Sequence, residues 1–321
     1  MTPVQSPEIR VGVSACLLGD EVRYNGGHAR DRYVVGTLAE HFTFVKVCPE
    51  EEVGMGTPRP TVRLEGHRDD PRMIEPVSGK DWTSAMNKFS TVRAREMGGA
   101  GLSGFIFKSK SPSCGVFRVK VYTESGHPGD PGAGLFARAM MKRHPLLPIE
   151  EEGRLHDPGL RENFLERVFA YHRLKSLFAG RWKRGELIDF HAREKYLLMA
   201  HSPAGLKKLG QLAARVKDHS PAEFRDLYMR GFMEVLAKKT TVKSHVNALQ
   251  HMSGYLRDHL DPAARQSVHA TIEDYRRELV PLIVPLTLLK HHLKRHPVPD
   301  WVHQQVYLNP YPKEMMLRNH V

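Results

Sequence analysis

Residues 104–115 read Gly-Phe-Ile-Phe-Lys-Ser-Lys-Ser-Pro-Ser-Cys-Gly, and this stretch decides the fold of the first half of the chain. The apolar run from Phe105 to Phe107 is bounded by turn residues, which is typical of a short buried β-strand. The Ser- and Lys-rich loop that follows ends at Cys114, just past the carboxyl end of the predicted strand.

Two further cysteines have the same setting. Cys16 follows the apolar segment 11–14, and Cys48 follows the segment 42–47. In an open parallel sheet, ligands bind at the carboxyl ends of the strands, where the connecting loops meet. We therefore expect the three thiols to lie together at one edge of a sheet, although 32 and then 66 residues separate them along the chain.

Strand-like and helix-like segments alternate through the first half of the chain. The predicted strands are 11–14, 42–47 and 105–107 with a hairpin at 61–64 and 73–74, and the predicted helices are 31–41, 82–97 and 134–143. Such alternation indicates crossover connections between parallel strands. We predict an α/β domain over residues 1–147, Rossmann-like with a mainly parallel sheet.

The second half has a different pattern. Three prolines between 145 and 158 and the acidic run Glu150 to Glu152 predict a linker at 148–158. Beyond it helical periodicity dominates, and Ser202-Pro203 and Ser220-Pro221 are typical helix starts. We predict an all-α domain over residues 159–321, with helices near 162–178, 187–200, 203–216, 224–237, 242–260, 262–279 and 286–296.

The charge of the 321-residue chain is +12 and is unevenly distributed. Residues 151–321 contain 28 of the 48 Lys and Arg but 19 of the 36 Asp and Glu, a formal charge of +9. A polyanionic partner accounts for this excess, and so does a basic solvated surface. Three cysteines argue against a secreted disulfide framework, and neither a membrane-length apolar run nor a secretory signal is present. We expect a cytoplasmic protein that does not associate with a membrane, and we predict no protein partner.

Four interpretations of the three cysteines are open. Free thiols are often buried and inert. Structural zinc favours four ligands with short Cys-x-x-Cys spacing, which this chain lacks. A nucleophilic Cys/His pair needs a histidine partner, and none is identifiable for the first two cysteines. Our main hypothesis is an iron–sulfur cluster held by three cysteines, which leaves one iron open to act as a Lewis acid on a substrate atom.

Polar residues near the cysteines are candidate site residues. Glu50, two residues after Cys48, is a candidate general acid or base. Arg23 and Asn25 suit a substrate carbonyl or an anion, and Arg59 is placed to meet an anion. The loop before the last cysteine adds hydroxyls and cations at Ser109, Lys110, Ser111 and Ser113. The alternative interpretation is ordinary turn chemistry and solvated charge.

Four segments of the first half resemble the thiouracil desulfidase family. They are Val-Ser-Ala-Cys-Leu-Leu-Gly at 13–19, Val-Arg-Tyr-Asn-Gly at 22–26, Cys-Pro-Glu at 48–50 and Lys-Ser-Lys-Ser-Pro-Ser-Cys-Gly at 108–115. The resemblance implies a [4Fe-4S] cluster on Cys16, Cys48 and Cys114, whose fourth iron takes the sulfur of a thiocarbonyl substrate. It also implies that Glu50 acts as acid or base and that Ser111 acts as proton donor.

The second half resembles a helical domain that is often fused to desulfidases. The segments that resemble it are 195–203, 247–251, 275–277, 281–289 and 307–312. The two-domain resemblance implies an enzyme that removes sulfur from 4-thiouridine in tRNA, with the helical domain as an RNA platform. Two alternatives remain: a desulfidase of free thiouracil or a thionucleoside, and a non-catalytic, metal-containing, RNA-binding adaptor.

Overall fold

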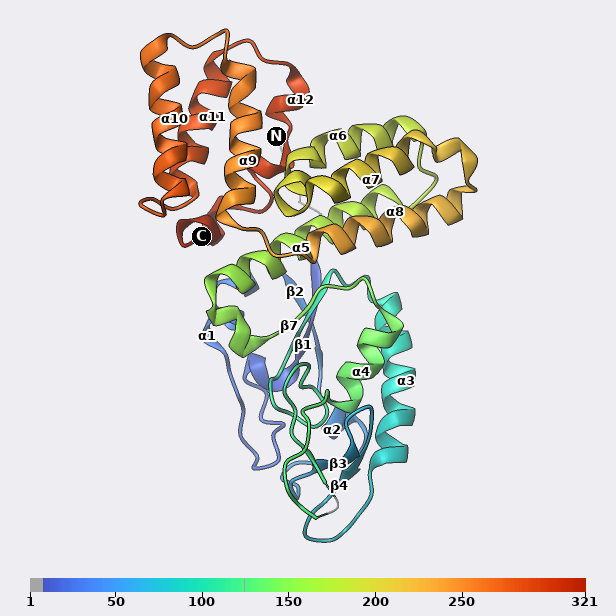
Figure 1. Cartoon of the computed structure of the whole chain (residues 1–321). Helices are drawn as coiled ribbons and strands as arrows, with labels where there is room; N and C mark the ends of the chain where they lie inside the picture. The colour runs from blue at the N-terminus through green and yellow to red at the C-terminus, as the bar shows by residue number, and fades with distance from the viewer. Residues whose placement is uncertain (1–7, 124) are drawn as a thin grey trace, which may run out of the picture. The chain divides into compact units, whose positions relative to one another are not determined.

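The computed structural model describes residues 8–123 and 125–321, and the chain divides into two compact units, Met1–His156 and Asp157–Val321 (Figure 1). The first unit is an α/β unit and the second is helical, as the sequence predicts. None of the helices in the described residues is both long and apolar enough to cross a membrane.

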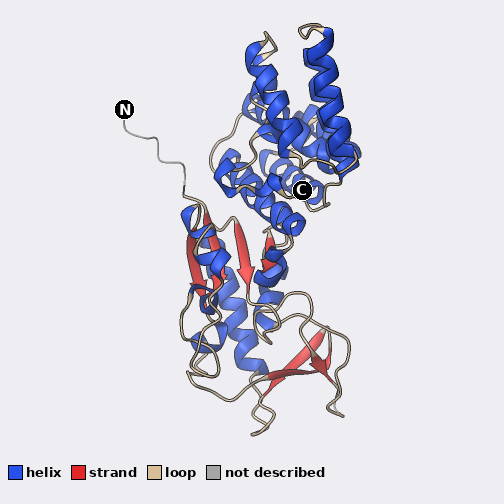
Figure 2. Ribbon diagram, turned by 90° about the vertical axis from the view of Figure 1, so that its left-hand side faces the viewer, coloured by secondary structure: helices blue, strands red, loops and turns tan. Residues whose placement is uncertain are grey.

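The main sheet of the first unit has four parallel strands (Figure 2). In spatial order they are β2 (Thr43–Val47), β1 (Arg10–Ser14), β5 (Gly104–Phe107) and β7 (Ile149–Glu151). Val13 of β1 lies opposite Lys46 of β2 and Ile106 of β5. Because all the pairings are parallel, the carboxyl ends of the strands, and the loops that leave them, share one edge of the sheet.

Strand β5 is central because it is buried along its whole length. The rings of Phe105 and Phe107 stack with their centroids 4.0 Å apart, and Phe136 of α4 (Leu135–Arg143) meets both rings edge-on. A Cβ atom at Gly12 of β1 would lie 2.2 Å from the Phe105 ring, so this position has room only for glycine. Helix α4 in turn packs against α3 (Thr83–Gly99).

A second, smaller sheet contains the predicted hairpin. Its strands, in spatial order, are β4 (Asp70–Ile74), β3 (Arg63–His67) and β6 (Val121–Tyr122). Strands β3 and β4 are antiparallel, and β6 runs parallel to β3. Leu64 and Met73 point into a core that Met86 of α3 and Leu135 of α4 complete.

Two segments of the first unit differ from the prediction. The segment 31–41 forms only the short helix α1 (Arg32–Val35) and a 3-10 turn at Leu38–Glu40. Gly36 interrupts the helix there, with φ −90° and ψ −88°. The predicted linker contains β7 and a 3-10 turn at Glu152–His156. Its acidic run is buried because each carboxylate accepts hydrogen bonds from the folded unit, a feature that composition does not reveal.

The second unit consists of helices. They are α5 (Pro158–Leu177), α6 (Arg184–His201), α7 (Pro203–Ala214), α8 (Pro221–Leu236), α9 (Val242–Ser253), α10 (Pro262–Arg276), α11 (Ile283–Arg295) and α12 (Asp300–His303). The two predicted Ser-Pro starts are confirmed. The Ser202 side chain accepts the amide hydrogen of Gly205, and the Ser220 side chain accepts that of Glu223. Each bond satisfies one of the amide groups that a helix start leaves unpaired.

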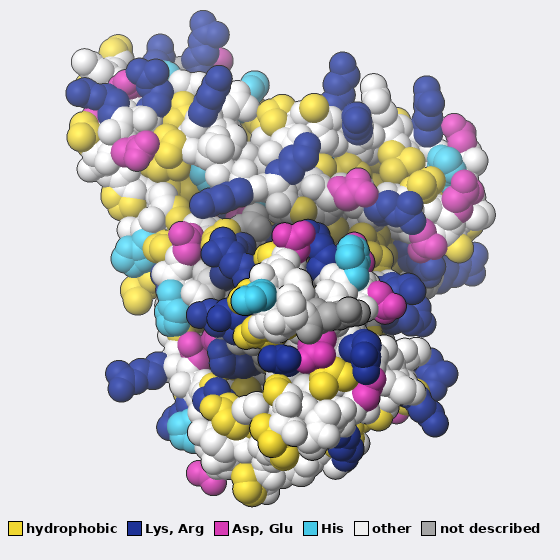
Figure 3. All heavy atoms as spheres, turned by 60° about the horizontal axis from the view of Figure 1, so that its bottom comes forward, with side chains coloured by type: hydrophobic (Ala, Val, Ile, Leu, Met, Phe, Trp, Pro, Cys, Tyr) yellow, Lys and Arg dark blue, Asp and Glu magenta, His cyan; other side chains and the backbone are white. Residues whose placement is uncertain are grey.

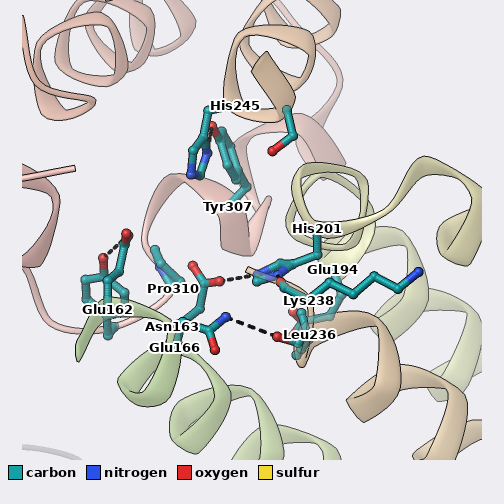
Figure 4. Close-up of polar contacts among 12 residues, drawn as sticks. Glu162, Asn163, Glu166, Glu194, His201, Leu236, Lys238, His245, Tyr307 and Pro310 are labelled. Atoms are coloured by element: carbon teal, nitrogen blue, oxygen red, sulfur yellow. Dashed lines mark hydrogen bonds and ion pairs between the residues drawn. The ribbon is translucent and has the colours of Figure 1, made fainter. Parts of the chain in front are cut away.

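A buried ionic network lies in the core of the helical unit (Figure 4). Arg318 Nε donates to Glu162 Oε1 at 3.1 Å, and Arg318 Nη2 lies 3.4 Å from Glu166 Oε2. The Tyr311 hydroxyl donates to Glu162 at 2.6 Å, and the His201 ring bonds Glu166. All five residues are at most 9% exposed, so the charges are compensated by one another and not by water.

Glu166 of this network and the neighbouring His245, a buried residue of α9, make the helical unit sensitive to acid. Burial, followed by the nearby Arg318 charge, lowers the pKa of His245 from 6.5 to about 3. Burial alone would raise the pKa of Glu166, but the charges of His201 and Arg318 outweigh it and lower that pKa from 4.5 to about 2. Below pH 6.5 the unfolded chain binds a proton at His245 that the folded chain does not bind until about pH 3. The contribution of His245 to stability therefore falls as the pH falls through that window, and Glu166 adds to the loss below pH 4.5. Burial raises the pKa of Glu162, which contributes with the opposite sign.

We expect the free energy of unfolding to decrease between pH 6.5 and 4.5, with a slope from His245 of up to about 1.4 kcal/mol per pH unit. Urea titrations followed by far-UV circular dichroism at several pH values measure this slope. In the His245→Gln variant the slope should be smaller over the same range. If the free energy of unfolding has the same pH dependence in the variant and in the wild type, the slope does not come from His245.

Candidate active site

The three cysteines line one cavity of about 330 Å³ in the first unit. Cys16 lies in the 3-10 turn Ala15–Leu18 that follows β1, and Cys48 caps the short helix α2 (Pro49–Glu52) after β2. Cys114 ends the loop after β5 and is buried, whereas the other two thiols are half-buried. The parallel order of the strands therefore places all three thiols in the wall of one cavity.

The surroundings of the thiols favour their protonated form when no metal is bound. Burial, followed by the neighbouring Cys48, raises the pKa of Cys16 to about 11. Burial also raises the pKa of Cys48 and that of Cys114. A bound metal removes such protons because its positive charge stabilises the thiolates.

The donor set of this cavity is suited to soft metals. Thiolate ligands select iron–sulfur clusters, zinc and copper(I). In residues 8–123 and 125–321, no three His, Cys, Asp or Glu side chains are grouped so that they could hold a single metal ion. In a [4Fe-4S] cluster each thiolate binds a different iron. Three separate thiols around one cavity therefore fit such a cluster.

Glu50 is fixed in the cavity wall by hydrogen bonds to both carboxylate oxygens. Arg59 donates to Oε2 from Nη2 at 2.6 Å and from Nε at 3.0 Å. Ser113 donates to Oε1 at 2.8 Å, and Ser111 lies 3.4 Å from the same oxygen. The Glu50 side chain remains 14% exposed, so its carboxylate is oriented and still reachable from the cavity.

Arg59 contacts an anion, as the sequence suggested, and this anion is the Glu50 carboxylate of the same chain. Its side chain is 4% exposed. Besides Glu50, it donates to the carbonyl oxygens of Gly56 and Val22 at 2.8 and 2.9 Å. Arg59 therefore connects the loop after α2 to the segment after β1, and it holds Glu50 between them.

The predicted serines have different surroundings. The Ser111 hydroxyl oxygen accepts the amide hydrogens of Ser113 and Cys114 at 3.2 and 3.1 Å, which leaves its own hydrogen free to donate. Ser111 lines the cavity, whereas Ser113 is fully buried behind Glu50. Ser109 lines the cavity, but its hydroxyl donates to Glu152 at 2.8 Å.

Of the remaining predicted residues, Arg23 and Lys110 lie in the cavity wall. Asn25 is not among the residues that form the wall in the described part of the chain. Its side-chain oxygen accepts the amide hydrogen of Gly27 at 3.2 Å and stabilises a turn. The turn chemistry that Asn-Gly-Gly predicts accounts for this position.

The prediction missed Lys108 and the two carboxylates Glu151 and Glu152. Lys108 lines the cavity, and Glu152 accepts hydrogen bonds from Lys108 and from Ser109. Their partners lie about 40 residues away in sequence, so no local motif connects them. The available signal was the acidic run itself, three carboxylates in a segment with apolar neighbours.

Comparison with known proteins assigns each half of the chain to a family. Residues 11–152 match the family model described as 2-thiouracil desulfurase. Residues 195–312 match DUF1722, a family described as protein of unknown function.

Two curated relatives are similar to separate parts of the chain. The uncharacterized protein YbgA of Escherichia coli (strain K12) is 33% identical over 159 residues, which cover 49% of this chain and 94% of that protein. The uncharacterized protein YbbK of Bacillus subtilis (strain 168) is 32% identical over 119 residues, which cover 36% of this chain and 78% of that protein.

One solved structure is also similar to part of the chain. It is described as the [4Fe-4S]-dependent thiouracil desulfidase TudS. It is 28% identical and has a TM-score of 0.38, and the match covers 47% of this chain and 95% of that one.

Proposed function

The chain belongs to the 2-thiouracil desulfurase family through its first unit and to the DUF1722 family through its second, and from this membership we propose that it removes sulfur from a thiolated uracil with the help of a [4Fe-4S] cluster. The observation that supports the proposal most directly is one cavity lined by three thiols and by a carboxylate held in a defined orientation. The overall reaction exchanges the thiocarbonyl sulfur for the oxygen of water and releases hydrogen sulfide, without net oxidation or reduction.

Cys16, Cys48 and Cys114 are the proposed ligands of the cluster. When bound, a cluster with three cysteine ligands supplies an open iron that acts as a Lewis acid on the substrate sulfur. The remaining chemistry belongs to the side chains of the cavity wall.

Glu50 is the proposed general base for the attacking water. Its Oε2 is occupied by Arg59, which fixes the plane of the carboxylate and leaves Oε1 to accept a proton. Ser113 donates to Oε1 from the buried side and thereby orients this oxygen. A base that is already oriented spends no free energy on reorganisation during the reaction.

Ser111 is the proposed proton donor. Because its oxygen accepts two amide hydrogens, its own hydrogen is directed away from the backbone. This hydrogen is donated toward Glu50 Oε1 at 3.4 Å, so the Ser111 hydroxyl and the proposed base face the same part of the cavity and can act on neighbouring atoms of one substrate. Arg23 and Lys110 are the proposed contacts to the rest of the substrate.

The preferred substrate is 4-thiouridine in tRNA, because residues 151–321 have a formal charge of +9. On the face drawn in Figure 3, Lys and Arg side chains are spread over the surface with Asp and Glu among them. The preference for tRNA therefore depends on the total charge and not on a single basic patch of that face. Free thiouracil or a thionucleoside is the second candidate, supported by the family description of the first unit alone.

The substrate class is tested by anaerobic incubation of the cluster-loaded chain with thiolated tRNA, with 4-thiouridine and with 2-thiouracil, each followed by sulfide release. We expect the highest kcat/KM on tRNA, with a strong decrease as salt is added. Activity on the free base or nucleoside alone would overturn the tRNA assignment. No sulfide release from any of the three would overturn the desulfidase function itself.

The role of Glu50 is tested by Glu50→Gln, which keeps the size of the side chain and removes its basicity. We expect kcat to fall about 10²-fold, the lower range for loss of a general base. Glu51→Gln is the matched control, because Glu51 is the next residue of the same helix and is 42% exposed. It accepts from the Thr57 hydroxyl at 2.6 Å and lies 3.8 Å from Arg59 Nη1, and it has no bond to Ser111 or Ser113 among the contacts described. Equal activity of the two variants would remove Glu50 from the mechanism.

A further inference from the structure

The acidic run of β7 and the turn after it holds the cysteine loop at both ends. Glu151 Oε1 accepts the amide hydrogens of Val116 and Phe117 at 2.7 and 3.2 Å, just after Cys114. Glu152 Oε2 accepts the amide hydrogen of Ser109 at 2.7 Å, at the beginning of the same loop. The loop between these two points contains the proposed proton donor and the buried proposed ligand.

Glu152 also makes a second set of contacts, which are not needed to hold the backbone of the loop in place. Its Oε1 accepts hydrogen bonds from the ammonium group of Lys108 and from the hydroxyl of Ser109. The Glu152 side chain is 10% exposed and that of Lys108 is 24% exposed. Hydrogen bonds between such shielded ionic groups are short and strongly oriented.

Lys108 reaches the cavity, whereas Glu152 does not belong to the described cavity wall. The Lys108 amide also donates at 2.9 Å to Oγ of Ser14, the last residue of β1 and two residues before Cys16. Lys108, Cys16, Cys48 and Cys114 all line this one cavity. Lys108 therefore places a cation in the wall that contains the proposed ligands, and Glu152 fixes its ammonium group there.

We propose that Glu152 is a positioning residue of the active site, which fixes the Lys108 ammonium at the cavity wall and orients the loop that contains Ser111 and Cys114. The proposal rests on the desulfidase function proposed above. Residues that hold the groups around a metal centre typically change metal affinity or activity 10- to 100-fold when they are replaced. Glu152 meets that description through Lys108 and Ser109.

The first experiment compares Glu152→Gln with Glu150→Gln in the full, cluster-loaded chain. Glu150 is a matched control because it is equally buried in the same acidic run but accepts from Arg154 Nε at 2.7 Å. For Glu152→Gln we expect kcat/KM to fall about tenfold and iron to pass to a chelator about tenfold faster. For Glu150→Gln we expect kcat/KM and the rate of iron transfer to the chelator to stay within about twofold of the wild-type values. Equal values of kcat/KM and of the iron-transfer rate in Glu152→Gln and Glu150→Gln would overturn the proposal.

The second experiment separates positioning from simple structural support by a double-mutant cycle with Lys108→Met. If Glu152 acts through Lys108, adding Glu152→Gln to Lys108→Met changes kcat/KM and the iron-transfer rate by less than about twofold. Fully multiplicative effects would overturn the claim that Glu152 acts through Lys108. Glu152→Asp keeps the charge and should recover part of the lost rate. If neither Glu152 variant folds, the residue is structural and the proposal is overturned.

The two readouts distinguish this proposal from the function on which it rests. If the wild-type chain releases no sulfide from any thiolated substrate, the desulfidase function fails. The role of Glu152 is then tested only by the rates of iron transfer from the Glu152 and Glu150 variants. If the wild type is active and the Glu152 and Glu150 variants behave alike, the function stands and the positioning role fails.

Discussion

A chain with Cys114 replaced by alanine is expected to lose its iron and to stop releasing sulfide. Cys114 is buried at the end of the loop after β5, with its amide hydrogen bonded to Ser111. Without its thiol, two ligands remain, which are too few to retain the cluster. Loss of a Lewis acid removes several kcal/mol of transition-state stabilisation, and 1.4 kcal/mol corresponds to a factor of ten in rate. Turnover should therefore fall by about 10³-fold or more.

The measurements for Cys114→Ala are iron and acid-labile sulfide per chain, the rate of sulfide release, and the affinity for tRNA. Ser90→Ala is the control, since Ser90 is a small buried residue of α3 and is not among the residues of the cavity wall in the described chain. Ser90→Ala should keep both iron and activity. If Cys114→Ala retains its iron, the ligand assignment is wrong. If both chains bind RNA equally and neither releases sulfide, the adaptor interpretation replaces the enzyme.

Replacing Arg318 by methionine should destabilise the helical unit by about 3–5 kcal/mol, the cost of leaving a buried charge without its partner. Arg318 is 4% exposed and is bonded to Glu162, while its guanidinium also lies 4.9 Å from the centre of the Tyr307 ring. Methionine fills part of the volume but removes the guanidinium that pairs with Glu162 and Glu166, and the His201 ring contacts Glu166 alone. The free energy of unfolding from urea titration measures the loss.

Arg276→Met is the matched control for this experiment. Arg276 is paired with Glu273 on α10, but its side chain is 61% exposed. Surface ion pairs contribute about 0–1 kcal/mol, so the control should stay within that range. Similar losses for the two variants would show that burial does not determine the strength of the Arg318 contacts.

Features that depend on local sequence could be predicted. The run Phe105 to Phe107 is apolar and bounded by turns, and it forms the buried strand β5. The Ser-Pro pairs start α7 and α8, because a cap involves only neighbouring residues. The position of each cysteine just after a strand also depends only on local pattern, and parallel pairing then places the three thiols in one cavity.

Features that depend on distant partners could not be predicted. The segment with Glu150 to Glu152 has the composition of a linker, and its carboxylates become structural only because Ser109 and Val116 supply hydrogens 43 and 35 residues away. The side chain of Asn25, another polar residue near a cysteine, accepts the amide hydrogen of Gly27 in its own turn. The Arg318 network is equally invisible, because nothing local distinguishes its charges from solvated ones.

The distance in sequence between Glu162 and Arg318, 156 residues, has a consequence for biosynthesis. The ribosome releases α5 with both of its acidic side chains long before the guanidinium group that neutralises them is translated. During that interval the nascent helices cannot close their interior around Glu162 and Glu166 without a steep desolvation penalty. The helical unit is therefore expected to complete its packing late in translation, when residues near 318 have left the exit tunnel.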